Sequence, residues 1–140
     1  MEKPPLQVMR DGKDSSVIIE LEYTDGDGDI GLEPADTLAP FNWGSKYFYN
    51  LYVNVYKVEN GISSPILIPA STDTVQYNDR ILNLTPTGKH KSIYGTIKLN
   101  IKALPYPGIT PDSMYYTIQI ADRSLHLSNV IQTQVMRFQF

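Results

Sequence analysis

Apolar and polar residues alternate with a period of two along most of this chain, which is the pattern of half-buried β-strands. The alternation is clearest over residues 92–102, where Ile97, Leu99 and Ile101 are separated by polar side chains. Strands are also predicted over residues 17–24, 47–58, 114–121 and 130–138. The phase slips within the last of these, as a β-bulge would produce. Shorter strands are predicted over residues 6–9, 65–68 and 75–84, with a hairpin turn at Asn60-Gly61.

No segment carries a sustained apolar stripe of helical period, and a helix has room only within residues 33–46. The strands recur at the intervals typical of two packed antiparallel sheets. We therefore predict an all-β chain that folds as a seven-stranded antiparallel β-sandwich with a Greek-key connection. Residues 6–140 are expected to form one domain. Residues 1–5 are expected to be a linker or cloning remnant, because Pro4-Pro5 directly precedes the first strand.

Composition narrows the classes of function. The net charge is −3 and the 12 Lys and Arg residues are scattered, so nucleic acid is not an expected partner. No apolar run approaches the roughly 18 residues of a membrane helix, so membrane insertion of this segment is not expected. There is no cysteine, and neither His90 nor His126 has a partner acid at a recognisable spacing. No nucleophile or phosphate-loop motif occurs, so we do not expect an enzyme.

An acidic loop follows the strand predicted over residues 17–24. Asp25, Asp27 and Asp29 alternate with glycines, which permit the backbone angles needed to turn three carboxylates toward one point. Oxygen ligands at this spacing suit Ca²⁺, although an EF-hand is rejected because Ile30 replaces the usual glycine and no helices flank the loop. In a sandwich, the strand predicted over 114–121 ends at the same end of the molecule, which adds Asp122. The alternative is that aspartate and glycine simply form turns here.

Aromatic residues suggest a second candidate site. Tyr52 and Tyr56 are predicted on the outer face of their strand, and Trp43 lies in the preceding loop. An exposed aromatic surface of this kind commonly binds protein or glycan ligands. Tyrosine is also a natural strand residue that packs its ring and wets its hydroxyl, so the same residues are compatible with a purely structural role.

The last 40 residues resemble the closing half of a fibronectin type III domain. The residues that carry the resemblance are Ala103-Leu104-Pro105, the strand Tyr115 to Asp122, and Ser128-Asn129 ahead of a final strand. The resemblance implies that Leu104 and Tyr116 are counterparts of a tyrosine corner. An immunoglobulin-like relative fits equally well, because the long loop from Asp25 to Lys46 and the position of Trp43 depart from the fibronectin pattern.

Two further segments, residues 24–31 and Ala121-Asp122-Arg123-Ser124, look like those of immunoglobulin-like domains in surface lipoproteins of Bacteroidetes-type bacteria. Such domains are typically exported and held by a lipid tether, which here would lie outside the sequence. The resemblance therefore implies an extracellular or outer-membrane location. It is consistent with a non-catalytic module for adhesion, spacing or recognition, braced by Ca²⁺ at Asp25, Asp27, Asp29 and Asp122. The alternatives are a carbohydrate-binding module that uses Trp43 and the tyrosine face, and an accessory domain of a larger enzyme.

Overall fold

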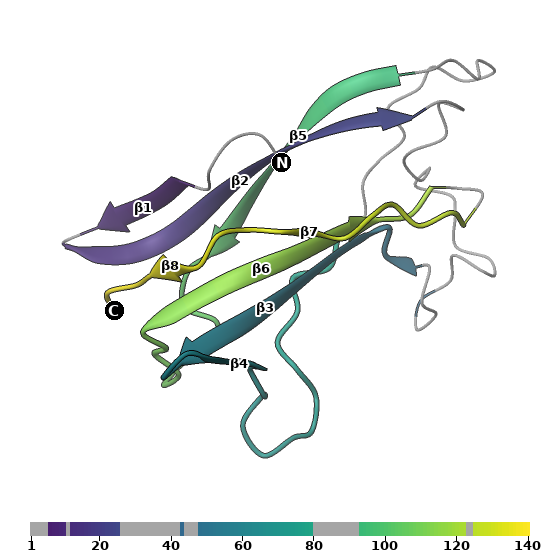
Figure 1. Ribbon diagram of the computed structural model, residues 1–140. Helices are drawn as coiled ribbons and strands as arrows, with labels where there is room; N and C mark the ends of the chain where they lie inside the picture. Colours follow the sequence, from purple (N-terminus) through teal and green to yellow (C-terminus); the bar gives the residue numbers. More distant parts are fainter. Residues whose placement is uncertain (1–5, 11, 26–42, 44–47, 80–92, 123–124) are drawn as a thin grey trace.

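The chain folds into two antiparallel β-sheets, an arrangement compatible with a β-sandwich (Figure 1). The computed structural model describes residues 6–10, 12–25, 43, 48–79, 93–122 and 125–140. One sheet has three strands in the order β1-β2-β5. The other has five strands in the order β4-β3-β6-β7, with β8 also paired to β6. The all-β prediction is confirmed for the described residues, in which every regular element is a strand.

The three-stranded sheet is built on the long strand β2 (Lys13–Asp25), which pairs with β1 (Leu6–Arg10) and β5 (Ile93–Lys102). β2 is longer than predicted because Asp14 and Lys13 also pair with β1, beyond a register shift between Val8 and Met9. Alternate residues Val17, Ile19 and Leu21 are buried, as the period-two pattern requires.

The five-stranded sheet is centred on β3 (Leu51–Glu59) and β6 (Ser113–Ile120), which pair over the whole of β6. Their inner faces bury alternate residues, and these join the buried residues of β2 in one core. The members from this sheet are Leu51, Val53, Val55, Met114, Tyr116 and Ile118. The two inner faces therefore hold the sheets together by apolar burial, and the outer faces are left for solvent or for a ligand.

The predicted turn at Asn60-Gly61 is confirmed. Both residues have positive φ, 52° and 77°, as a type I′ hairpin turn demands. The turn sets the register of β4 (Ile62–Pro65), which begins earlier than the strand predicted over residues 65–68. The rest of that predicted strand makes a short antiparallel pairing, in which Leu67 forms a bridge with Thr74. The chain leaves the edge after Pro65 because Ile66 turns into the core, where it is 2% exposed.

Residues 74–79 return along the edge of β3 that β4 leaves open. The backbone N–H of Tyr77 donates to Val53 at 2.9 Å, and Leu51 and Asp79 exchange two hydrogen bonds of 3.0 Å. These contacts confirm pairing within the first half of the strand predicted over 75–84, and the remainder lies outside the described residues. As a consequence, the side chains of Gln76 and Asn78 are brought beside β3.

The predicted last strand is divided into β7 (Ile131–Gln132) and β8 (Met136–Arg137). Both pair with β6, but the register changes between them. Three steps along β6 separate Thr117 from Met114, whereas four steps separate their partners Gln132 and Met136. The extra residue is the predicted phase slip, and it explains why Gln134 and Val135 are exposed in succession. The described residues form eight strands, so the predicted count of seven is not confirmed.

Tyr116 lies in the core and does not form the expected tyrosine corner. Its side chain is 0% exposed, and its hydroxyl has no hydrogen-bond partner within the described part of the chain. A tyrosine corner requires that hydroxyl to bond to the backbone. Tyr116 does not form the corner because it occupies an inward-facing position in the middle of β6. Burial, with smaller contributions from Tyr77 and Asp14, raises the pKa of Tyr116 well above its usual value.

A polar seam joins the two sheets near the first and last strands. The carboxylate of Asp14 on β2 accepts hydrogen bonds from the backbone N–H of Gln139 at 2.7 Å and from Gln7 Nε2 at 3.3 Å. The N–H of Asp14 donates to the carbonyl of Gln139 at 2.8 Å, and Gln7 Nε2 also donates to the carbonyl of Arg137 at 2.8 Å. An open groove of about 510 Å³ runs along this seam. The seam therefore joins the two sheets by hydrogen bonds, in addition to the apolar contact of their shared core.

Candidate functional site

The four predicted Ca²⁺ ligands are only partly placed by the structure. Asp25 is the last residue of β2, and Asp122 follows shortly after β6. Figure 1 shows β2 and β6 pointing in the same direction, so both strands end on the same side of the molecule. This agrees with the topological reasoning that adds Asp122 to the loop. Asp27 and Asp29 lie outside the described residues, as do most of the residues of the predicted 25–46 loop.

Asp122 closes the turn that follows β6. Its Oδ1 accepts the backbone N–H of His126 at 2.8 Å, and its Oδ2 lies 3.2 Å from the Nδ1 of the same histidine. The Asp122 N–H donates to the carbonyl of His126 at 3.0 Å, and Leu125 N–H donates to the carbonyl of Asp122 at 3.1 Å. The expectation that His126 has no partner acid is therefore wrong. The sequence signal for this pair is the spacing of four residues between Asp122 and His126, which a tight turn brings together.

Among the described residues, no group of three or more His, Asp or Glu side chains is arranged to hold a metal ion. Both oxygens of Asp122 already face His126, and its side chain is only 15% exposed. A cation at this position would have to displace the contacts that His126 makes with both oxygens. The Ca²⁺ loop thus stays a prediction, and the described part of it is a well-bonded turn.

The predicted aromatic residues separate into two groups along β3. Trp43, 75% exposed, contacts the ring of Phe48 edge to face at a centroid distance of 4.8 Å. Tyr52 belongs to the same end of the strand, where its hydroxyl donates to the carbonyl of Tyr49 at 2.8 Å. Tyr56 is four residues further along, about 14 Å away in an extended strand. Tyr52 and Tyr56 thus lie on the same outer face of β3 with Asn54 between them.

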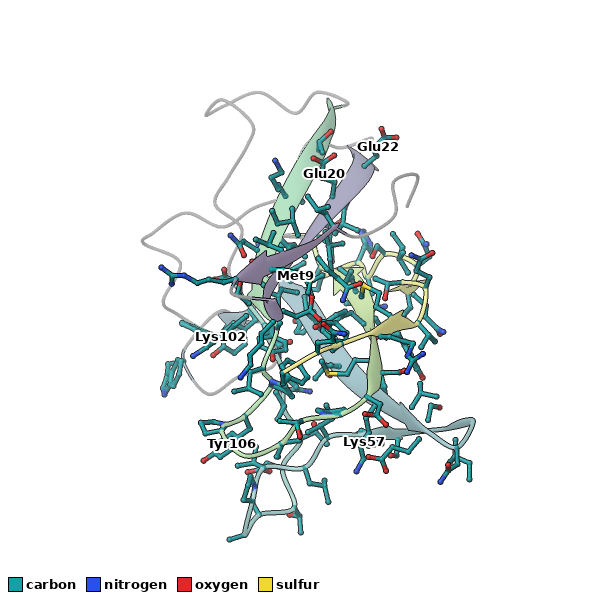
Figure 2. The ribbon with its side chains drawn as sticks, turned by 90° about the vertical axis from the view of Figure 1, so that its left-hand side faces the viewer. Met9, Glu20, Glu22, Lys57, Lys102 and Tyr106 are labelled. Carbon is teal, nitrogen blue, oxygen red and sulfur yellow. The ribbon has the colours of Figure 1, made fainter. Side chains whose placement is uncertain are left out.

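The outer faces of the two sheets differ sharply in charge. On the three-stranded sheet, the outward residues of β2 and β5 include Glu20, Glu22, Lys98 and Lys102, and Glu20 pairs with Lys98 across the strands at 3.7 Å. Figure 2 shows Glu20 and Glu22 following one another along β2. A surface on which opposite charges pair across the strands is typical of a face exposed to water.

The outer face of the five-stranded sheet carries two uncharged rows of side chains that cross the strands. The polar row is fixed by the pairing of Asn54 with Gln76 and Thr117, and of Thr117 with Gln132. The aromatic row lies two residues further along β3 and consists of Pro65, Tyr56 and Tyr115. Successive outward residues lie about 7 Å apart along a strand. We call these seven residues the uncharged face.

The rings of Tyr56 and Tyr115 form a stacked pair in the aromatic row. Their centroids are 5.1 Å apart and their planes are inclined by 16°. Both side chains are half-buried, and neither hydroxyl has a hydrogen-bond partner among the described residues. Sequence reasoning identified Tyr56 but missed Tyr115. The signal was available, because Tyr115 is an outward-facing residue of the predicted strand 114–121, but its partner depends on the register.

A directional chain of amide hydrogen bonds runs along the edge of β3 into the polar row. The backbone N–H of Val53 donates to Asn78 Oδ1 at 3.0 Å, Asn78 Nδ2 donates to Gln76 Oε1 at 3.2 Å, and Gln76 Nε2 donates to Asn54 Oδ1 at 2.8 Å. A backbone N–H can only donate, so the first bond fixes the orientation of every amide that follows. The chain therefore ends on Asn54 Nδ2, which donates to no acceptor within the described residues.

Comparison of the chain with protein-family models, curated proteins and solved structures finds no match. The described residues also contain no helix with the length and apolar character needed to cross a membrane.

Proposed function

We propose that this protein is a non-catalytic β-sandwich module for recognition and adhesion, and that it binds its ligand through the uncharged face. Its fold is proposed to be of the fibronectin type III or immunoglobulin-like kind, with a Greek-key connection. The strand orders β1-β2-β5 and β4-β3-β6-β7 support this, because β4 and β5 are consecutive in sequence yet belong to different sheets. Location at a cell surface, through a lipid tether outside the sequence, is part of the same proposal.

The observation that carries the proposal is the asymmetry between the two outer faces. Charged side chains such as Glu20 and Lys98 are well solvated on a face that stays in water, whereas half-buried aromatic rings are not favoured there. The uncharged face has the opposite composition, with tyrosine enriched and Lys, Asp and Glu absent from its two rows. Interaction surfaces are distinguished by this enrichment of aromatic residues and depletion of charged ones.

The proposed Ca²⁺ loop is a brace for one end of the module rather than a reactive centre. Asp25, Asp27, Asp29 and Asp122 are its proposed ligands. A thermal melt in millimolar Ca²⁺ against excess chelator tests this part. Ligand at 100 times its dissociation constant adds about 2.7 kcal/mol of stability, which raises the midpoint by several degrees. We expect Asp27→Asn to abolish the rise, and an equal midpoint with Ca²⁺ and with chelator in the unaltered protein would remove Ca²⁺ from the proposal.

Binding through the uncharged face is tested on immobilised arrays of extracellular-matrix proteins and of glycans. The double variant Tyr56→Ala/Tyr115→Ala removes the stacked pair, and the matched control Glu20→Ala/Lys98→Ala alters the opposite face. We expect ligands retained by the unaltered protein to be lost by the first variant and kept by the second. Retention by both variants, or no retained ligand on either array, would refute the proposal.

A further inference from the structure

We propose that the ligand of the uncharged face is a neutral oligosaccharide, seated across the polar row with Asn54 as its central hydrogen-bond donor. This inference rests on the proposed recognition function and specifies the chemistry that the face selects. Three features support it: the charge of the face, the open end of the amide chain and the two tyrosine hydroxyls of the aromatic row.

The absence of charged side chains from the polar and aromatic rows argues against an ionic ligand. The chain carries 12 Lys and Arg and 15 Asp and Glu residues, yet none of them belongs to the polar or the aromatic row. The adjacent row on the other side of the polar row, Asn78, Tyr52 and Gln119, is uncharged as well. The exposed cation on this outer face, Arg137, pairs with Ser113 and so lies two rows away from the polar row. An acidic glycan, a phosphate or a charged peptide segment would therefore be desolvated on the polar row without a counter-charge beside it. A neutral ligand incurs no such cost.

The amide chain orients the side-chain amide of Asn54 so that its Nδ2 group is available as a hydrogen-bond donor. Each link from Val53 through Asn78 and Gln76 polarises the next, and the last amide offers its Nδ2 hydrogens at Asn54. Thr117 and Gln132 continue the row across the sheet and can both donate and accept. A sugar hydroxyl does the same, so a row of hydroxyl groups can be matched along the whole polar row.

The aromatic row supplies the apolar half of the recognition. A pyranose ring presents C–H groups on its faces and hydroxyl groups around its rim. The stacked rings of Tyr56 and Tyr115 provide apolar surface beside the polar row, and their two hydroxyls, unpartnered within the described residues, can bond to the rim. The polar row spans three inter-strand spacings, about 14 Å, which gives room for a short oligosaccharide rather than a single sugar.

The experiment titrates the full chain with xylohexaose, cellohexaose, mannohexaose and chitohexaose, and with an oligogalacturonate as the charged comparator. Binding is followed by calorimetry and by the side-chain amide signals in ¹⁵N NMR spectra. We expect at least one neutral hexasaccharide to bind and to shift the amide signals of Asn54 and Gln132, while the charged comparator binds more weakly. No binding of any neutral probe would overturn the inference.

Asn54→Asp is the sharpest variant, because it keeps the oxygen that accepts from Gln76 and replaces only the free donor. We expect it to weaken binding by about tenfold or more. Asn100→Asp makes the same change on the outer face of β5 and should leave the affinity unaltered. Equal affinity of Asn54→Asp and the unaltered protein would overturn the inference. If the face binds a protein ligand on the array but no saccharide, the recognition function stands and the oligosaccharide does not.

Discussion

Replacing Tyr116 by phenylalanine should make the protein more stable. The substitution removes one hydroxyl from the core and keeps the ring, which is 0% exposed. That hydroxyl has no hydrogen-bond partner in the described part of the chain, so it loses its bonds to water on folding without replacement. The upward shift of its pKa has the same cause, because no nearby group favours the phenolate.

The size of the effect follows from the cost of an unsatisfied buried polar group, about 1–3 kcal/mol. Phenylalanine fills nearly the same volume, so the cavity left behind is too small to offset much of the gain. We therefore expect Tyr116→Phe to raise the free energy of unfolding by about 1–2 kcal/mol. For a domain of this size, the melting midpoint should rise by about 2–6 °C.

Urea denaturation and a thermal melt at neutral pH measure the change, with Tyr52→Phe as the matched control. The hydroxyl of Tyr52 donates to the carbonyl of Tyr49, so its removal should lower stability by about 0.5–1.5 kcal/mol. The two variants should thus have opposite signs. A lower or unchanged stability of Tyr116→Phe would refute the reasoning, because the hydroxyl would then have a partner such as a buried water molecule.

Three other perturbations have defined outcomes. Burial raises the pKa of Tyr77 from 10.0 to about 12, and it also raises the pKa of Tyr116. Both phenols therefore ionise at a lower pH in the unfolded chain than in the folded protein, and stability should fall as pH rises from 10 toward 12. The urea midpoint should decline over this range. Asp14→Ala leaves the N–H of Gln139 without its acceptor and should cost about 1–3 kcal/mol in urea denaturation, and an unchanged midpoint would contradict the importance of the seam. Leu125 has a φ of 67°, so Leu125→Gly should relieve strain and raise the melting midpoint, whereas Leu125→Val should lower it.

Local patterns were sufficient to predict the strands because the alternation of apolar and polar residues within a strand indicates which of its side chains are buried. The alternation in residues 92–102 predicted β5 to within one residue, and Asn60-Gly61 predicted its own turn through the preference for positive φ. The strand expected over residues 65–68 is confirmed only in part, because Pro65 ends β4 and Leu67 then forms an isolated antiparallel bridge with Thr74. Ile66 is buried by turning inward from the sheet edge, which the hairpin register decides.

The candidate site was harder to predict because it depends on contacts between distant strands. Tyr56 was identified from its own strand, but its partner Tyr115 becomes visible only through the register of β3 and β6. The amide chain needs the return of residues 74–79 along β3, which no local pattern encodes. The tyrosine corner failed for a related reason, since the phase of β6 directs Tyr116 inward.

The polar seam has a consequence for how the protein is made. Gln7 bonds to the carbonyl of Arg137, and Asp14 bonds to Gln139, so the contacts span 130 and 125 positions of the chain. A ribosome releases residues in order, and the earliest strands leave the exit tunnel long before residues 137–139. During that interval the Asp14 carboxylate lacks the backbone N–H of Gln139, and none of the hydrogen bonds of the seam can form. The hydrogen-bonded joining of the two sheets is therefore a late event of biosynthesis, which waits for the translation of residues 137–139.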